Sequence, residues 1–276
     1  MTPLIEVRNL RFTYGGAERP ALDGLELVVD EDELVCVVGP NGSGKSTLAR
    51  ILAGLARPDA ADVARVAGHD LLTREGRMAV RRDAGILFQN PDNQIVGTTV
   101  EEDVAFGLEN LALDAAEIRV RVDEMLDSFD LTALATREPH LLSAGQKQRT
   151  ALAGVLAIPR RLLVLDEPTA MLDPTGATEV LAALGRARAD GLTVVHVTQE
   201  MDEVRSAGRV VAVEGGRSVF DGSPEELFSR ADTVTRLSLG LPPAAALAVA
   251  LERRGVAIGV LPLTVEGLVA ALESRA

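Results

Sequence analysis

The fold is decided by the stretch Gly39-Pro40-Asn41-Gly42-Ser43-Gly44-Lys45-Ser46, which lies between the apolar run Leu34–Val38 and a segment of helical periodicity. It matches the phosphate-loop pattern G-x-x-x-x-G-K-[ST], which requires a strand before it and a helix after it. The glycines let successive backbone N–H groups converge on a β-phosphate at a helix N-terminus. Lys45 would supply a cation to the β- and γ-phosphates, Ser46 would offer its hydroxyl to Mg²⁺, and Thr47 is expected to meet the α-phosphate. The stretch therefore predicts a phosphate site that includes Mg²⁺.

A second motif places two carboxylates at the end of a buried strand. The apolar run Leu162–Leu165 is followed directly by Asp166 and Glu167. Such a strand delivers its acids to the carboxyl edge of a parallel sheet, the edge that binds ligands. We expect Asp166 to hold Mg²⁺ through water and Glu167 to polarise an attacking water. The alternative is a strand that simply ends in solvated acids, but the phosphate loop upstream favours the functional interpretation.

Short apolar strands alternate with helical segments along most of the chain. We expect strands at 4–10, 25–29, 34–38, 85–88, 162–165, 193–197 and 210–213. We expect helices from Lys45 through Leu55 with a stop at Pro58, and around 100–110, 114–128, 145–157, 174–189 and 200–206. This alternation predicts an α/β fold with a mainly parallel sheet, and the segment at about 90–160 reads as a helical insertion. A capping box at Ser223–Glu226 opens a further helix, and residues 231–276, with helical pieces around 243–254 and 264–273, are interpreted as a small C-terminal module.

The composition excludes several classes of protein. Hydrophobic residues make up 47% and aromatic residues 3% of the 276 residues, so the core must be built from Ala, Leu and Val. The net charge of −13 repels phosphate backbones, and nucleic acid is therefore not expected as a partner. The N-terminus does not resemble a signal peptide, and the most apolar stretch, Leu237–Leu251, is too short to span a bilayer. We expect the protein in the cytoplasm, with any membrane contact made through another protein.

A third motif, Leu142-Ser143-Ala144-Gly145-Gln146, lies just before the acidic strand. Ser143 and Gln146 have the spacing of a capping box, so a well-capped helix is the simpler interpretation. Together with the other two motifs, in this order, it resembles the signature sequence of the ATP-binding-cassette (ABC) family, usually Leu-Ser-Gly-Gly-Gln. The resemblance implies that family's phosphate-loop fold over residues 1–230, with N-terminal antiparallel strands, and ATP as the nucleotide. It also implies that Ser143, Gly145 and Gln146 meet the γ-phosphate held by an opposite subunit, where Ala144, in place of the family's glycine, predicts weaker closure.

Three further positions match landmarks of the same family. Tyr14 stands where the family places an aromatic that stacks on adenine, although an aromatic at a strand end is more often a packing residue. Gln89 matches the glutamine that touches Mg²⁺ and faces the membrane partner. Asp173 matches the loop that crosses the dimer interface, although Asp173-Pro174 equally forms an N-cap with proline at the first helical position.

One family landmark is missing. The family usually has a Thr-His dipeptide after the strand that corresponds to Thr193–Val197, and here the dipeptide is Thr198-Gln199. The Gln199 amide can still hydrogen-bond a γ-phosphate, but it cannot become cationic and lacks the rigid link of an imidazole to the catalytic base. His196 on that strand, His140 before the signature motif and His69 in an expected loop are given structural roles.

A narrower resemblance rests on Leu87–Gln94, on Thr99–Asn110 and on the tail. These segments look like the ATPase subunits of energy-coupling-factor transporters, the vitamin and cobalt or nickel uptake systems. In that group a C-terminal extension of the size and place of residues 231–276 holds the ATPase pair together. The resemblance implies a dimer with a second ATPase, identical or paralogous, that binds two MgATP. It further implies a transmembrane coupling subunit and a substrate-binding membrane subunit as partners, on the inner face of the cell membrane.

The resemblance also implies the chemistry of ATP hydrolysis. Glu167 would act as the base, Lys45 and Mg²⁺ would stabilise charge, and Gln89 and Gln199 would complete the site. Two other functions stay open. One is a soluble cassette ATPase for cofactor assembly or DNA maintenance, although the negative charge argues against DNA. The other is a regulatory nucleotide-binding subunit with slow turnover, suggested by Ala144 and Gln199.

Overall fold

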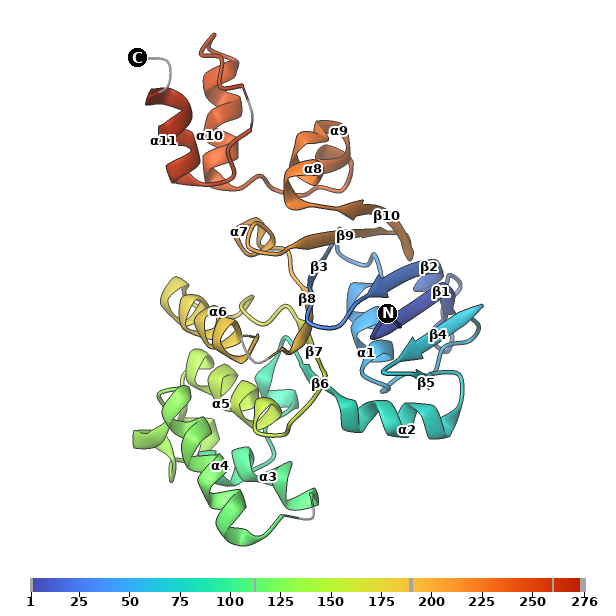
Figure 1. The fold of residues 1–276 in the computed structure, drawn as a ribbon, viewed down its shortest axis with the longest axis vertical. Helices are drawn as coiled ribbons and strands as arrows, with labels where there is room; N and C mark the ends of the chain where they lie inside the picture. Colours follow the sequence, from blue (N-terminus) through green and yellow to red (C-terminus); the bar gives the residue numbers. More distant parts are fainter. Residues whose placement is uncertain (1, 112, 189–190, 260, 274–276) are drawn as a thin grey trace.

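Two β-sheets enclose the helix that follows the phosphate loop (Figure 1). The computed structural model describes residues 2–111, 113–188, 191–259 and 261–273. The larger sheet has the strand order β10-β9-β3-β8-β7-β6, and the smaller sheet has the order β2-β1-β4-β5. Helix α1 (Lys45–Leu52) buries Leu48, Ile51 and Leu52 in one hydrophobic cluster with residues of both sheets. The packing against both sheets therefore holds α1 in place after the phosphate loop.

The larger sheet is parallel except for its last strand. Its strands are β3 (Leu34–Val38), β6 (Ala84–Leu87), β7 (Leu162–Asp166), β8 (Thr193–Val197), β9 (Arg209–Glu214) and β10 (Arg217–Gly222). Five of them pair in parallel, and only β10 runs antiparallel, to β9. The predicted parallel sheet is thus confirmed. The carboxyl ends of β3, β6, β7 and β8 meet at one edge, where α/β sheets bind their ligands.

The smaller sheet is antiparallel throughout, as expected for the N-terminal strands. Its members are β1 (Ile5–Phe12), β2 (Leu22–Val29), β4 (Val63–Val66) and β5 (His69–Asp70). The sequence did not predict β4, β5 or β10: β4 and β5 have only four and two residues, and β10 shows little alternation of buried and exposed residues. The expectation that His69 lies in a loop was wrong, because His69 belongs to β5 and pairs with Val66 of β4.

The helices lie close to their expected bounds, with four exceptions. They are α1, α2 (Arg74–Asp83), α3 (Val100–Phe106), α4 (Ala115–Ser128), α5 (Ala144–Leu156), α6 (Pro174–Arg188), α7 (Met201–Val204), α8 (Pro224–Ser229), α9 (Ala231–Arg236), α10 (Pro243–Glu252) and α11 (Val265–Glu273). Short 3₁₀ helices are η1 (Pro91–Asn93), η2 (Leu108–Asn110), η3 (Thr132–Leu134) and η4 (Pro139–Leu141). Residue 189, expected to end the helix of α6, lies outside the described residues.

The exceptions have local causes. Neither α2 nor α9 was predicted, because each buries a single residue, Val80 and Val234, and no apolar stripe marks it. Helix α1 ends at Leu52 rather than near Leu55, since Gly54 takes a left-handed φ of 69° and leaves Leu55 45% exposed. The helix expected at 100–110 breaks at Gly107, after which the chain continues as the 3₁₀ helix η2.

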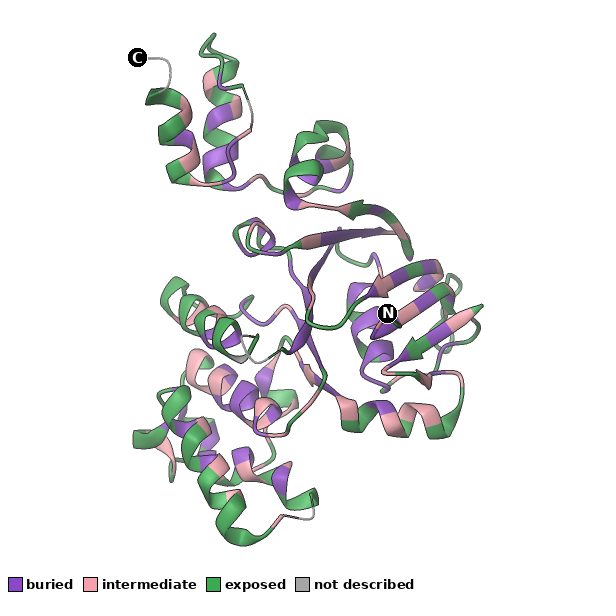
Figure 2. Ribbon diagram, viewed as in Figure 1, coloured by how far each residue is buried: buried purple, intermediate pink, exposed green. Residues whose placement is uncertain are grey.

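The helices of the insertion form a layer against one end of the larger sheet. Their buried residues share one hydrophobic cluster with β7 and α6, including Val104, Leu126, Leu152 and Leu163. Figure 2 shows buried residues on the sides of α3 and α5 that contact each other and exposed residues along much of α4. In the described ranges, no helix combines the length and the apolar character that crossing a membrane requires.

The residues of the C-terminal helices belong to two hydrophobic clusters, one shared with the larger sheet and one formed between α10 and α11. Val234, Leu237, Ala245 and Leu263 are buried in a cluster with Phe220 and other residues of the larger sheet's end. Farther out, α10 and α11 pack on each other through Ala244, Ala248, Ile258 and Leu268. The core packing therefore continues past residue 230, the boundary proposed from the sequence. Residues 260 and 274–276 of the proposed module lie outside the described residues.

Candidate active site

The loop between β3 and α1 is shaped to present backbone N–H groups. Gly39 and Gly44 take φ values of 144° and 107°. A Cβ on Gly39 would lie 2.1 Å from the Val213 carbonyl oxygen, and one on Gly44 would lie 2.5 Å from that of Ala21. Only glycine fits either position. The first turn of α1 has no side-chain cap, so its N–H groups can meet an anion.

Lys45 lies folded over this loop. Its side chain is buried, and Nζ donates to the carbonyl oxygens of Gly39, at 2.8 Å, and Pro40, at 3.1 Å. Burial lowers the pKa of Lys45, while the nearby carboxylates of Glu167 and Asp166 act in the opposite direction. The ammonium group is thus held against the loop backbone, within reach of an anion bound there.

Ser46 and Asp166 come together from α1 and the end of β7. The Ser46 hydroxyl donates to Asp166 Oδ1 at 2.8 Å. Burial raises the pKa of Asp166, against the effects of the Ser46 hydrogen bond and of Arg50 and Lys45. A hydroxyl and one carboxylate are hard oxygen donors, and Mg²⁺ is usually held by such a small set together with phosphate oxygens. The donor set therefore fits Mg²⁺ bound with a nucleotide, and among the described residues no larger cluster of His, Cys, Asp and Glu competes for an ion.

Glu167 is held at the point where three strands end. Its Oε2 accepts a hydrogen bond from Gln89 Nε2 at 2.9 Å, just beyond β6. Its Oε1 accepts one from Gln199 Nε2 at 2.6 Å, just beyond β8. Its own backbone is left-handed, with φ 52°, and its N–H donates to the Val197 carbonyl at 2.9 Å. The structure thus brings Gln89, Glu167 and Gln199 together, as the sequence predicted, and holds the carboxylate in one orientation.

Gln199 has a firmer connection than the sequence suggested. Besides the bond to Glu167, its Nε2 donates to Asn41 Oδ1 of the phosphate loop at 2.7 Å. Although the amide is not a rigid ring, it does reach the expected base, and because it carries two protons it can bridge two acceptors. What the amide does lack is the charge of an imidazolium.

Tyr14 lies beside the loop, and two different observations bear on its role. Its hydroxyl is 3.1 Å from Thr47 Oγ1, and its ring packs edge-on against Phe12 with centroids 4.8 Å apart. The ring stays 43% exposed. The contact with Phe12 supports a packing role for Tyr14. The exposed part of Tyr14 lies next to Thr47, the residue expected at the α-phosphate, so it could also contact a nucleotide.

The signature residues lie apart from the chain's own phosphate loop. Ser143 and Gln146 form a reciprocal capping box at the start of α5, with hydrogen bonds of 3.3 and 3.0 Å. The Asp173 carboxylate accepts from Gly176 N at 2.8 Å at the start of α6. Within the described residues, neither Ser143, Gly145 nor Asp173 hydrogen-bonds to loop 39–47. Both helix starts are exposed, which leaves them open to a second chain.

The histidines stay away from these groups. His69 Nε2 lies 3.0 Å from Asp83, and exposed His140 lies 3.4 Å from Glu138. His196 is buried on β8, with Nε2 3.2 Å from Glu203. None of the three contacts Glu167 or the phosphate loop, in agreement with the structural roles given to them.

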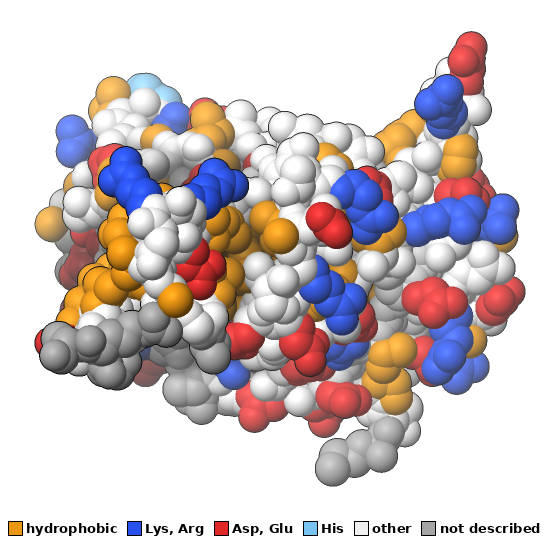
Figure 3. All heavy atoms as spheres, turned by 90° about the horizontal axis from the view of Figure 1, so that it is seen from above, with side chains coloured by type: hydrophobic (Ala, Val, Ile, Leu, Met, Phe, Trp, Pro, Cys, Tyr) orange, Lys and Arg blue, Asp and Glu red, His pale blue; other side chains and the backbone are white. Residues whose placement is uncertain are grey.

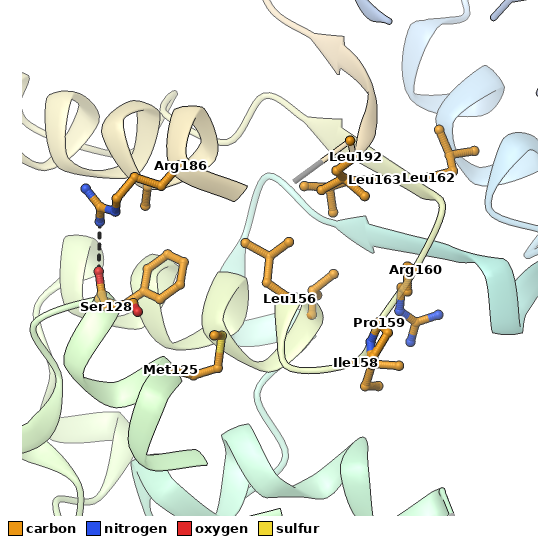
Figure 4. A pocket seen from close by; sticks show the side chains of 14 residues that line it. Met125, Ser128, Leu156, Ile158, Pro159, Arg160, Leu162, Leu163, Arg186 and Leu192 are labelled. Atoms are coloured by element: carbon orange, nitrogen blue, oxygen red, sulfur yellow. Dashed lines mark hydrogen bonds between the residues drawn. The ribbon is translucent and has the colours of Figure 1, made fainter. Parts of the chain in front are cut away.

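A cavity of about 460 Å³ lies at the opposite end of the strands (Figure 4). Apolar side chains such as Met125, Leu156 and Leu163 line it between α4, α5, α6 and the start of β7. The guanidinium groups at its two ends bind backbone carbonyls, Arg186 that of Ser128 at the end of α4 and Arg160 that of Ala84 at the start of β6. It contains none of the residues at the carboxyl edge.

The fold and the site together define a class of protein. A phosphate loop follows β3, two acids stand at the end of β7, which β8 separates from β3, and two glutamines hold the second acid in place. Such an arrangement is that of a phosphate-loop nucleoside triphosphatase with a helical insertion.

Comparisons with known proteins give the family. Residues 22–170 match the ABC transporter family. The chain is 48% identical to the energy-coupling factor transporter ATP-binding protein EcfA1 of Symbiobacterium thermophilum, over 98% of this chain and 96% of that protein. It is 45% identical to EcfA1 of Bacillus subtilis, over 96% and 95%. The chain therefore belongs to the ABC transporter family, in its group of energy-coupling factor ATP-binding proteins, and is an ATP-binding ATPase.

Solved structures agree with this assignment. CbiO1 from Clostridium perfringens, part of the ABC transporter complex cbiONQ, superposes with a TM-score of 0.76 at 33% identity, over 91% of this chain and all of that one. A dimeric post-hydrolysis state of the ATP-binding cassette MJ0796 with ADP and Pi superposes with a TM-score of 0.73 at 30% identity, over 80% and 98%. The expected cassette fold is confirmed.

Proposed function

We propose that this chain is one ATPase of a pair that drives an importer for a vitamin or a transition-metal ion. The observation that carries the proposal is the carboxylate of Glu167, held between Gln89 and Gln199 beside the phosphate loop. The printed names of its relatives, energy-coupling factor transporters and the cbiONQ complex, support the transport role. The substrate itself would be chosen by a separate membrane subunit.

The residues at the carboxyl edge of the larger sheet would have separate roles in ATP hydrolysis. The N–H groups of the loop and Lys45 would bind the β- and γ-phosphates, with Tyr14 against the adenine. Ser46 and Asp166 would hold Mg²⁺, with Gln89 nearby, and the ion would neutralise charge on the phosphates. Glu167 would take the proton of a water, and its two amide donors would keep its free lone pairs aimed at that water.

A second chain would complete the site. Ser143 and Asp173 are exposed and Gly145 is half-buried at helix starts, and within the described residues none of them hydrogen-bonds to the phosphate loop of its own chain. Helix N-termini of this kind favour anions. In a head-to-tail pair each chain would offer α5 to the γ-phosphate bound by the other, as the dimeric cassette with ADP and Pi suggests.

A groove beside Gln89 would receive the membrane partner. Its volume is about 560 Å³, and Asp92, Thr98, Glu138 and His140 contribute to its walls. Gln89 lies only a few residues before Asp92, so movement of a partner in this groove would reach Glu167. We propose that a transmembrane coupling subunit docks here, which places the chain on the inner face of the cell membrane.

Co-expression with candidate membrane subunits tests the proposed function. We expect a stable complex whose substrate-binding subunit retains a vitamin or metal ion, and whose ATP hydrolysis drives uptake into vesicles. Asp92→Lys, in the groove, should dissociate the membrane subunits while ATP binding by the isolated chain is retained. A complex that hydrolyses ATP without uptake of any ligand would contradict the transport role.

Helices α10 and α11 should hold the two ATPase chains together when no nucleotide is bound. Leu247, Val265 and Val269 are 52%, 62% and 46% exposed, and hydrophobic side chains gather over the C-terminal helices at the left of Figure 3. Because Val234 and Leu237 belong to the core, the chain should be cut after Leu241 rather than at 230; this cut still removes Ala245 and Leu263 from the same cluster, so some loss of fold stability is expected. We expect this truncated protein to fold and to dimerise about tenfold more weakly without nucleotide.

Point variants make the same test without removing the tail. Val265→Glu and Val269→Glu should weaken the nucleotide-free dimer in sedimentation, whereas Glu266→Gln on the same helix should not. A truncated chain as dimeric as the full chain would show that the tail has another purpose.

Gln199→His should raise ATP turnover only a fewfold. The amide already joins Glu167 and Asn41, so histidine adds charge rather than a new connection. A charge-assisted bond exceeds a neutral one by roughly 1 kcal/mol, which is about fivefold in rate. Turnover of Gln199→His, Ala144→Gly and the double variant should be compared in the same assembly. A rise only in the double variant would mean that the two sites limit each other, and no rise in any would show that neither departure slows the enzyme.

A further inference from the structure

One buried carboxylate outside the groups described so far joins the two loops that carry Glu167 and Gln199. Glu203, on α7, is 8% exposed. Its Oε1 accepts a hydrogen bond from the Thr169 hydroxyl, and its Oε2 accepts one from the Thr198 hydroxyl. Thr169 follows Glu167 by two residues, and Thr198 directly precedes Gln199. A single side chain thus bridges the segments after β7 and β8.

The hydrogen-bonded bridge from Thr169 through Glu203 to Thr198 is buried and has a carboxylate at its centre. Thr169 and Thr198 are 6% and 1% exposed, and His196 lies behind the carboxylate with Nε2 3.2 Å from Oε2. Burial by itself would raise the pKa of Glu203, but His196 and the two hydroxyl donors outweigh it and lower the pKa. A buried carboxylate is costly unless it is fully hydrogen-bonded, so its partners are held in fixed places.

The same network shapes the turn that carries Gln199. The Thr198 hydroxyl donates to Glu203 and accepts from Glu200 N at 3.0 Å. On the other side, the strained left-handed backbone of Glu167 is held by its N–H bond to Val197. A strained conformation persists only when its surroundings over-determine it. The bond to Val197 and the bridge through Glu203 restrain Glu167 from two directions.

We propose that Glu203 is a positioning residue that sets the separation of Glu167 and Gln199 by tying Thr169 to Thr198. The proposal rests on the roles given above to Glu167 and Gln199. Within the described residues, the Glu203 side chain bonds to Thr169 and Thr198 and makes no hydrogen bond to the phosphate loop, so it would act only through Glu167 and Gln199. Its loss should therefore change the rate of hydrolysis more than the affinity for ATP.

Kinetics of the assembled transporter complex test this role. Displacing a reacting group by about 1 Å can cost about 100-fold in rate, so Glu203→Ala should lower kcat by about 10- to 100-fold. KM for ATP should change by less than about threefold, because the phosphate contacts of the loop are intact. Glu203→Gln should lose less, since its amide can accept from one hydroxyl and donate to the other. Asp202→Asn removes an exposed carboxylate from the same helix and serves as the matched control.

A double-mutant cycle separates positioning from general stability. If Glu203 acts through Gln199, then Glu203→Ala should have little further effect on kcat in a Gln199→Ala background. A merely structural role would make the two losses multiply. Should Glu203→Ala fail to fold, Thr198→Val and Thr169→Val cut the same bridge from its ends and enter the same cycle.

The outcomes keep this inference distinct from the proposed function. A kcat of Glu203→Ala within twofold of the parent, or losses that multiply in the cycle, would overturn the positioning role. If Glu167→Gln also kept its full kcat, the assignment of the base would fail instead.

Discussion

Glu167→Gln should bring ATP hydrolysis almost to a stop while ATP stays bound between two closed chains. General base catalysis contributes about 10²- to 10⁴-fold, so kcat should fall by that order. Binding should be retained, because the contacts to phosphate come from the loop and Lys45 and not from Glu167. Sedimentation with ATP should show a dimer that persists where the parent protein dissociates after turnover.

The local geometry makes this substitution a mild one for the fold. Glutamine keeps the size of Glu167 and can still accept a hydrogen bond from Gln89 or Gln199, while the other amide turns to water. Glu225→Gln, at an exposed position of α8, removes a carboxylate that takes no part in the site and should keep the parent kcat. If Glu167→Gln lost ATP affinity as severely as a phosphate-loop variant, Glu167 would not be the base.

Lys45→Ala should weaken ATP binding by about 10- to 100-fold. Hydrogen bonds to charged groups contribute about 1.5 to 3 kcal/mol, and 1.4 kcal/mol corresponds to tenfold in affinity. The Nζ position over the loop, bonded to Gly39 and Pro40, is where the cation would meet the phosphates. Titration of the isolated chain with a fluorescent ATP analogue measures the loss.

The only other lysine in the sequence supplies the control for that experiment. Lys147 lies on α5 and binds Asp92 at 2.6 Å, away from the loop of its own chain. Lys147→Ala should therefore leave the affinity of the isolated chain for ATP unchanged. Equal affinities for Lys45→Ala and the parent protein would remove Lys45 from the phosphate site.

The sequence motifs predicted which residues lie at the carboxyl edge of the sheet, but not the hydrogen bonds that join them. The spacing of the phosphate loop, the acidic strand and the signature motif located Lys45, Ser46, Asp166 and Glu167, because each motif needs its strand or helix at a fixed position. The bridge from Glu203 to Thr169 and Thr198 joins residues up to 34 positions apart and leaves no local pattern. An acid four residues after Gln199 was the only available signal.

The parts of the fold that the sequence did not reveal are those with little apolar patterning. Helix α2 is highly charged and buries only Val80, and strand β5 has two residues, so neither shows a period. The end of α1 was misplaced because the apolar spacing continued to Leu55, whereas the chain turns at Gly54. Backbone geometry at one glycine outweighed a favourable pattern.

At position 167 the residue that would stabilise the fold differs from the residue that hydrolysis needs, because the backbone of Glu167 is left-handed. A residue with a Cβ costs roughly 1–2 kcal/mol in that conformation, and glycine would avoid most of the cost. Selection for heat resistance alone would thus favour glycine at 167 and yield a sturdier chain unable to hydrolyse ATP. A carboxylate persists there only under selection for transport, so thermostable variants of this chain should be sought at other positions.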